Sequence, residues 1–156
     1  MFWRTSEEME ARQIYRWQWL RCVLINKWAM GLPHINTRLR KWLMRLGGLT
    51  IGDGGFIGMD GWFEECYPHR VIIGDNVTIS FRVTLVAHGP RRTEDMRIII
   101  EDGVYIGCNT TVLAGVTIGK GARVGAASVV TRDVPPGATV AGVPARVLVR
   151  AGEDEV

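Results

Sequence analysis

Aliphatic residues recur every six positions through the second half of the 156-residue chain, and this spacing constrains the fold more than any other feature. A six-residue step rotates far off one face of an α-helix. The small residues that follow many of these positions, such as Gly107 and Gly119, argue against a single long strand. A short fixed period is typical of a repeat architecture. The uninterrupted series is Ile100, Ile106, Val112, Ile118, Val124 and Val130.

The same period is found earlier in the chain. It begins at Ile51 and Ile57, breaks over residues 63–70, resumes from Ile73 and breaks again over residues 89–97. We predict that each six-residue unit is a short strand plus a turn, with one aliphatic side chain pointing inwards. No unit can bury that side chain alone, so stacked coils would form a solenoid with a continuous core.

Two amphipathic helices are predicted in the first 46 residues. The first starts after Ser6, with acidic residues in its first turn, and ends near Gly31. The second starts after Asn36 or Thr37 and stops at the glycine pair 47–48. Because the terminal coils of a solenoid need covering, we expect these helices to cap the first coil and residues 138–150 to cover the last. The apolar residues of the second helix follow helical spacing and are Leu39, Trp42, Leu43 and Leu46.

The helical segment differs from the rest of the chain in charge. Residues 1–48 hold nine Lys/Arg and three Glu, whereas residues 49–156 hold ten Lys/Arg and thirteen Asp/Glu. The basic residues do not lie along a recognised nucleic-acid-binding motif, so we expect no nucleic-acid binding. Two roles stay open for these helices: packing onto the first coil and between subunits, which we favour, or peripheral contact with a membrane. Their tryptophans include Trp17, Trp19, Trp28 and Trp42.

The cysteine content and the hydropathy of the chain indicate the cellular compartment to expect. The three cysteines are odd in number and lack C-x-x-C spacing, which argues against a disulfide framework. The opening MFWRTSEEME is too polar for a signal peptide, and three basic residues interrupt the most apolar stretch, residues 14–30. We therefore expect a cytoplasmic protein, with the inner face of the membrane as an open alternative.

Four segments resemble the hexapeptide-repeat acyltransferases, whose fold is a left-handed parallel β-helix. They are VYIG at 104–107, AGVTIG at 114–119, VVTRDVPP at 129–136 and AGVPAR at 141–146. The resemblance covers roughly residues 47–150 and is closest to small sugar and polysaccharide O-acetyltransferases. It implies a mainly β chain with an N-terminal α-helical segment. We divide the chain into a helical segment (1–48), a β-helix acyltransferase domain (49–150) and an acidic tail (151–156).

The resemblance also implies an activity and an assembly. Members are homotrimers with active sites between neighbouring subunits, and they bind acetyl-CoA along a groove. We therefore expect this chain to move an acetyl group from acetyl-CoA to a hydroxyl of a sugar or glycan, with a lipid-linked glycan as one option. No metal is expected. A non-catalytic trimeric scaffold is the alternative, and transfer to an amino acid or to an amino-sugar nitrogen also stays open.

His88 is the candidate catalytic residue among the three histidines. The segment VTLVAH at 83–88 resembles the strand that carries the family's catalytic histidine. An imidazole can accept a proton at neutral pH and so activate an acceptor hydroxyl as general base. His34 lies in a Pro-containing connection, and His69 precedes a coil, where it could contact the acceptor or a neighbour. Two histidines in the repeat region are too few for the three-histidine zinc site of a carbonic anhydrase.

Asp60, Glu64 and Tyr67 cluster in or near the first irregular stretch, where they either line the acceptor side or form a solvated face. On the acceptor side, a carboxylate could hydrogen-bond a sugar hydroxyl or orient His88. The residues that bind the acyl donor are implied by the resemblance. An acyl-cysteine intermediate at Cys108 is the less favoured alternative to direct transfer. The positions expected to bind acetyl-CoA are Tyr105, Cys108 and Ala126 along the pantetheine, and Thr131, Arg132 and Arg146 near the nucleotide.

Overall fold

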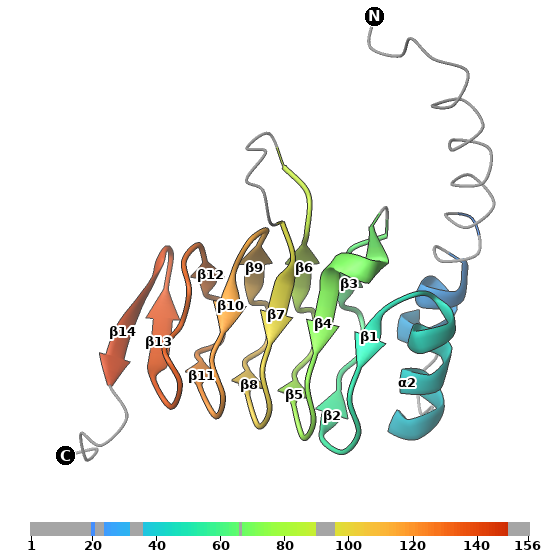
Figure 1. Ribbon diagram of the computed structural model, residues 1–156, viewed down its shortest axis with the longest axis horizontal. Helices are drawn as coiled ribbons and strands as arrows, with labels where there is room; N and C mark the ends of the chain where they lie inside the picture. The colour runs from blue at the N-terminus through green and yellow to red at the C-terminus, as the bar shows by residue number, and fades with distance from the viewer. Residues whose placement is uncertain (1–19, 21–23, 32–35, 66, 90–95, 150–156) are drawn as a thin grey trace, which may run out of the picture.

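Three parallel β-sheets form the sides of a solenoid in the computed structural model, which describes residues 20, 24–31, 36–65, 67–89 and 96–149 (Figure 1). The first sheet has the order β1-β4-β7-β10, the second β14-β13-β11-β8-β5-β2 and the third β12-β9-β6-β3. Each set of three consecutive strands, such as β1, β2 and β3, therefore completes one coil. The predicted fold class, a left-handed parallel β-helix with an N-terminal helical segment, is confirmed.

The strands are short, as a six-residue repeat requires. A 3-10 turn, η1 (Pro68–Arg70), precedes the second coil. The strands are β1 (Thr50–Ile51), β2 (Phe56–Ile57), β3 (Trp62–Phe63), β4 (Val71–Ile73), β5 (Thr78–Ile79), β6 (Thr84–Val86), β7 (Ile98–Ile100), β8 (Tyr105–Ile106), β9 (Thr111–Leu113), β10 (Thr117–Ile118), β11 (Arg123–Val124), β12 (Val129–Val130), β13 (Thr139–Gly142) and β14 (Ala145–Val149).

The predicted six-residue series lines the interior of the solenoid. Parallel register places Ile106 opposite Ile79 on one side and Val124 on the other, so aliphatic side chains stack from coil to coil. Each buried aliphatic side chain of this kind contributes about 1.5–3 kcal/mol. The inward position of the series is confirmed, because every member is at most 1% exposed: Ile100, Ile106, Val112, Ile118, Val124 and Val130.

Close approach of adjacent coils explains the small residues of the repeat. A Cβ atom added at Gly107 would lie 2.5 Å from the backbone nitrogen of Ala126 on the next coil. Such a contact is too short for a side chain, so only glycine allows the two backbones to come this near. The glycine is thus required by coil stacking.

The C-terminal end is a hairpin. Strand β13 pairs in parallel with β11 and so extends the second sheet, and β14 folds back antiparallel against β13. Residues 139–149 therefore add two strands to one sheet of the solenoid and end its parallel register at β13.

The predicted second helix is α2 (Thr37–Leu46), with Asn36 as its N-cap, and it lies against the first coil (Figure 1). Its inward face is basic. Arg40 is 2% exposed, its Nε donates to the Ala29 carbonyl at 2.9 Å, and its Nη1 donates to the Ile57 carbonyl at 2.7 Å. Burial lowers the pKa of the Arg40 guanidinium. Because no coil precedes the first, Arg40 supplies a donor that a neighbouring strand would otherwise provide.

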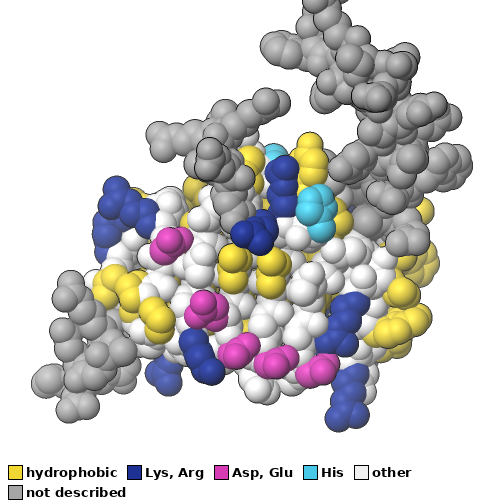
Figure 2. Space-filling view, in the orientation of Figure 1, with side chains coloured by type: hydrophobic (Ala, Val, Ile, Leu, Met, Phe, Trp, Pro, Cys, Tyr) yellow, Lys and Arg dark blue, Asp and Glu magenta, His cyan; other side chains and the backbone are white. Residues whose placement is uncertain are grey.

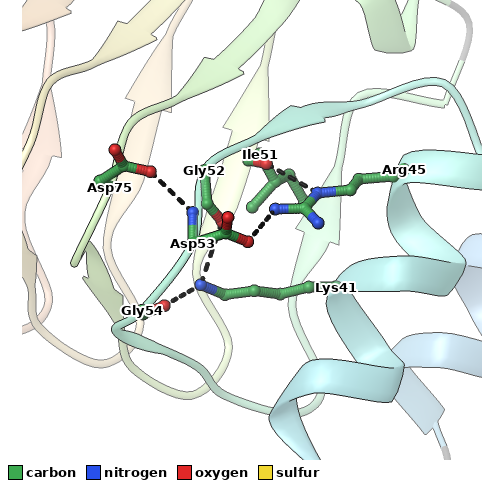
Figure 3. Close-up of polar contacts among 7 residues, drawn as sticks. All are labelled: Lys41, Arg45, Ile51, Gly52, Asp53, Gly54 and Asp75. Carbon is green, nitrogen blue, oxygen red and sulfur yellow. Dashed lines mark hydrogen bonds and ion pairs between the residues drawn. The ribbon is translucent and has the colours of Figure 1, made fainter.

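Two further cations of α2 bind the turn after β1 (Figure 3). Lys41 Nζ donates to carbonyls of the turn 52–54, and Arg45 Nε donates to the Ile51 carbonyl at 2.8 Å. Arg45 Nη2 also lies 2.7 Å from Asp53 Oδ1, and this hydrogen bond lowers the pKa of Asp53. Burial lowers the pKa of Lys41. Part of the basic charge of the helical segment thus caps the first coil.

The apolar residues that predicted α2 point mostly away from the solenoid. Leu43 packs against the core, but the other three are exposed. Residues 24–31 are also helical and carry exposed apolar side chains. We call the combined surface the helical apolar face; its residues are Leu20, Leu24, Trp28, Leu39, Trp42 and Leu46.

Several sequence predictions lie outside the described residues. They concern the start of the first helix with Trp17 and Trp19, His34, the charged part of the polar excursion at 90–95, and the acidic tail at 151–156. Within the part of the chain that the structure describes, no helix combines the length and apolarity needed to cross a bilayer.

Candidate active site

A histidine and a glutamate meet at the corner between the third and first sheets. Glu64 directly follows β3, and His88 lies shortly after β6. These strands pair in parallel with Phe63 opposite Leu85, so the residues that follow them lie on adjacent coils. His88 Nδ1 is 2.6 Å from Glu64 Oε2. A contact this short between an imidazole nitrogen and a carboxylate oxygen is a charge-assisted hydrogen bond.

Glu64 is fully buried and satisfied by hydrogen bonds. It is 0% exposed; Oε2 also accepts the Ala87 N–H at 2.9 Å, and Oε1 accepts the Tyr67 N–H at 3.2 Å. These donors compensate the burial of an ionised carboxylate. With Nδ1–H donating to Glu64, Nε2 of neutral His88 keeps its lone pair. The His88 side chain is 47% exposed, so a substrate can reach the imidazole.

Further contacts hold the chain around His88. Arg70 Nη1 donates to the Ala87 carbonyl at 3.2 Å, and the Arg70 guanidinium lies 4.0 Å over the Tyr67 ring. The rings of Trp62 and His88 meet edge to face with centroids 6.0 Å apart. The imidazole is therefore positioned by a carboxylate, an aromatic ring and a fixed strand end. Among the described residues, no group of three or more His, Cys, Asp or Glu is placed to hold a metal ion.

A second corner, between the second and third sheets, gathers other predicted residues. Cys108 and Ala126 lie in equivalent turns of adjacent coils, where Ala127 N–H donates to the Cys108 carbonyl at 2.8 Å. In the first coil the equivalent turn contains Asp60. A pocket of about 370 Å³ at this corner is lined by Asp60, Phe81, Arg82, Cys108 and Asn109. The structure thus brings one residue expected on the acceptor side next to one expected to bind the pantetheine.

The remaining residues expected to bind acetyl-CoA are spread over the surface. Tyr105 points outwards from the second sheet and is 46% exposed. Thr131 and Arg132 follow β12 and lie at the corner of His88, two coils further on. Arg146 is on β14 at the C-terminal edge. Within one chain, only Thr131 and Arg132 share a corner with the candidate base.

Glu64 needs a correction as an acceptor-binding residue. Its full burial leaves no surface for an acceptor, and its contact with His88 is the geometry expected for the other role considered from the sequence, that of orienting the imidazole. Tyr67 lies nearby, whereas Asp60 is at the second corner. Sequence analysis missed Trp62 as a neighbour of His88. Counting one coil back from His88 would have pointed to residues 62–65, because β3 pairs with β6.

The parallel β-helix built from six-residue units indicates the class of this protein. Residues 97–132 match the family described as bacterial transferase hexapeptide (six repeats). The hexapeptide-repeat containing acetyltransferase from Vibrio cholerae O1 biovar eltor, in a crystal structure complexed with acetyl coenzyme A, is 30% identical to this chain. That comparison covers 99% of this chain and 94% of the other, with a TM-score of 0.68. The chain belongs to the hexapeptide-repeat transferase family.

Two shorter similarities involve curated relatives. The serine acetyltransferase of Bacillus pumilus (strain SAFR-032) is 44% identical over 81 residues, which are 52% of this chain and 37% of that protein. The 2,3,4,5-tetrahydropyridine-2,6-dicarboxylate N-acetyltransferase of Staphylococcus aureus (strain JH9) is 57% identical over 56 residues, 36% of this chain and 23% of that protein. The chain therefore spans less than half the length of these relatives. One of these names gives serine as the acceptor, and the other specifies an N-acetyltransferase.

Proposed function

We propose that this protein transfers an acetyl group from acetyl-CoA to a hydroxyl of a sugar or glycan, with His88 as general base. The observation that carries the proposal is the half-exposed His88 held at Nδ1 by a buried carboxylate. That arrangement is suited to removing a proton from a weakly acidic hydroxyl. The complex of the Vibrio cholerae relative with acetyl coenzyme A supports the choice of donor.

The proposed acetyl transfer requires one base and no oxidant or reductant. Nε2 of His88 takes the hydroxyl proton as the acceptor oxygen forms a bond to the thioester carbonyl carbon. The tetrahedral intermediate collapses by breaking the C–S bond, and the imidazolium returns the proton to the departing thiolate of coenzyme A. The Glu64 carboxylate stabilises the imidazolium between these steps. Direct transfer needs no covalent enzyme intermediate, and we favour it over an acyl-cysteine at Cys108.

Release of free coenzyme A tests the proposed function. Wild-type protein is incubated with acetyl-CoA and a panel of sugars, other hydroxyl compounds and amines, and thiol release is followed with a colorimetric reagent. Hydroxyl-dependent release supports the proposal, and release only with amines assigns N-acetylation. No release together with no binding of acetyl-CoA by calorimetry would favour a non-catalytic scaffold.

Glu64→Gln is expected to reduce kcat on the order of 10²-fold with little change in the KM for acetyl-CoA. The glutamine keeps the size of the side chain and can still accept one N–H, but it has no charge to stabilise the imidazolium. Steady-state coenzyme A release measures both constants. Glu101→Gln is the matched control, since the Glu101 carboxylate accepts the backbone N–H of Lys120 at 2.7 Å and lies at another corner of the solenoid. Equal kcat in Glu64→Gln and wild type would contradict the orienting role.

A homotrimer with shared active sites is part of the proposal. Within one chain, the third sheet separates His88 from Cys108 and Ala126 at the neighbouring corner. A second protomer packed beside this sheet could bring its own corner next to His88. An exposed apolar side chain of this sheet, Leu113 on β9, would then be covered.

We propose a cytoplasmic location, with the helical apolar face covered by neighbouring protomers. On this basis the protein should stay in the supernatant when sedimented with anionic phospholipid vesicles at physiological salt. Pelleting that falls in a Trp28→Ser/Trp42→Ser double variant would instead assign the face to a membrane surface, where tryptophan and basic side chains bind together. Neutral vesicles serve as the control for charge.

A further inference from the structure

The first break in the repeat supplies a cation to the candidate active site. Ten positions separate the inward residues Phe63 and Ile73, whereas the repeat needs six. The additional residues include η1, whose last residue is Arg70. Arg70 is half-buried, and its guanidinium reaches the residue that precedes His88. Its contacts therefore affect how the candidate base is held.

The guanidinium holds the peptide group that joins Ala87 to His88. Arg70 Nη1 donates to the Ala87 carbonyl at 3.2 Å. The Ala87 N–H donates to Glu64 Oε2 at 2.9 Å, so both polar backbone groups of this fully buried alanine are fixed. The Cα atom of His88 is attached to the peptide group that Arg70 holds. A rotation of that group would therefore move the imidazole away from Glu64.

The same guanidinium holds the second donor to Glu64. It lies 4.0 Å over the Tyr67 ring, which is a cation–π contact. Residues three positions apart eclipse each other in a 3-10 turn, and the Arg70 N–H donates to the Tyr67 carbonyl at 2.9 Å. The Tyr67 N–H in turn donates to Glu64 Oε1 at 3.2 Å. Arg70 is thus connected to both carboxylate oxygens, through Ala87 to Oε2 and through Tyr67 to Oε1.

A guanidinium suits this double contact better than an ammonium. It is planar and carries five donors in a fixed fork, so it can cover an aromatic ring while one N–H donates to a carbonyl. The ammonium of lysine is a compact, strongly hydrated charge. Arg70 Nη1 also lies 3.9 Å from Met96 Sδ, so the guanidinium is contacted by three residues. The shape of the side chain therefore matters as well as its charge.

We propose that Arg70 is a positioning residue for the general base. It fixes the Ala87–His88 peptide group and the Tyr67 ring. Through them it keeps Nδ1 of His88 on Glu64 and leaves Nε2 free for the acceptor. This inference rests on the proposed function for the reaction that His88 performs. The state of the imidazole can nevertheless be measured without any turnover.

The first measurement is the tautomer of His88, read from the ¹⁵N NMR signals of the ring nitrogens in the full chain without substrate. His88→Ala assigns the signals. Because a hydrogen bond at one ring nitrogen sets which nitrogen carries the proton, we expect the Nδ1–H form to prevail when the wild-type imidazole is neutral. In Arg70→Met the Nε2–H form should gain population, whereas Arg38→Met, at an exposed position of α2, should give the wild-type spectrum. The wild-type tautomer in Arg70→Met would overturn the inference.

The second measurement is steady-state release of coenzyme A. Arg70→Met is expected to lower kcat at least about tenfold with little change in KM, because a displaced base loses alignment with the reacting atoms. The double variant Glu64→Gln/Arg70→Met should lose less than the product of the two single losses, because both changes disturb one hydrogen-bonded unit. A loss equal to that product would contradict positioning through Glu64 and His88. A raised KM with unchanged kcat would make Arg70 a substrate-binding residue and also overturn the inference.

The two measurements separate the role of Arg70 from the proposed function. If wild-type protein releases no coenzyme A with any acceptor, acetyl transfer fails, and the tautomer alone decides whether Arg70 holds the imidazole. If Arg70→Met does not fold by circular dichroism, Arg70→Lys replaces it, because lysine keeps a donor and the aliphatic stem but lacks the planar fork. Losses in the same direction are then expected, and a wild-type tautomer together with wild-type kcat in Arg70→Lys would overturn the inference.

Discussion

His88→Ala is expected to lower kcat/KM for acetyl transfer by about 10²–10⁴-fold, the range that a general base contributes. At 1.36 kcal/mol for each factor of ten, this corresponds to roughly 3–5 kcal/mol of transition-state stabilisation. The fold should be retained, because the side chain is half exposed and outside the core. Steady-state release of coenzyme A measures the loss, with circular dichroism to verify folding.

His69→Ala is the matched control for this measurement. His69 is an exposed histidine on η1, and its ring centroid is 6.3 Å from that of Tyr67, so it lies in the same region as His88. Its replacement should change kcat/KM less than about threefold. A loss in His69→Ala equal to that in His88→Ala, or full activity in His88→Ala, would contradict the assignment of the base.

Arg40→Met is expected to lower the free energy of unfolding by about 2–4 kcal/mol. Methionine fills much of the same space, but the carbonyls of Ala29 and Ile57 lose their donors, at about 1–3 kcal/mol for each buried acceptor left unsatisfied. Removing a buried cation recovers part of this cost. Urea denaturation at several protein concentrations measures the change and separates it from any effect of subunit dissociation.

The control is Arg38→Met on the same helix. Arg38 is exposed, and a surface substitution of this kind changes stability by no more than about 0.5 kcal/mol. If the two variants lost equal stability, charge on α2 in general would be responsible. If Arg40→Met were as stable as wild type, the carbonyls of the first coil would not need the guanidinium.

The solenoid could be predicted from sequence because its signal is local and repeated. Ile106 and Val124 are core residues for the same reason, namely their position in a six-residue unit. The orientation of α2 could not be predicted in this way. Helical periodicity locates an apolar stripe, but the inward face carries Arg40 and Lys41, because the carbonyls of the first coil need donors. That need exists only once the coil has formed.

The candidate site was predictable in part. His88 stands out because it ends a repeat strand at a break in the period, and the resemblance places the family's base there. Its partner Glu64 lies in an irregular stretch on the preceding coil, so the pair is visible only when the register of β3 against β6 is known.

The basic cap on the first coil also determines how copies of the chain can grow into larger assemblies. An open solenoid end could accept the edge of another copy, and repeated addition would produce a fibre. Arg40, Lys41 and Arg45 already occupy carbonyls that such an incoming edge would need. At the other end, antiparallel β14 interrupts the parallel register. The cationic contacts at the first coil and the reversed direction of β14 therefore both disfavour end-to-end polymerisation.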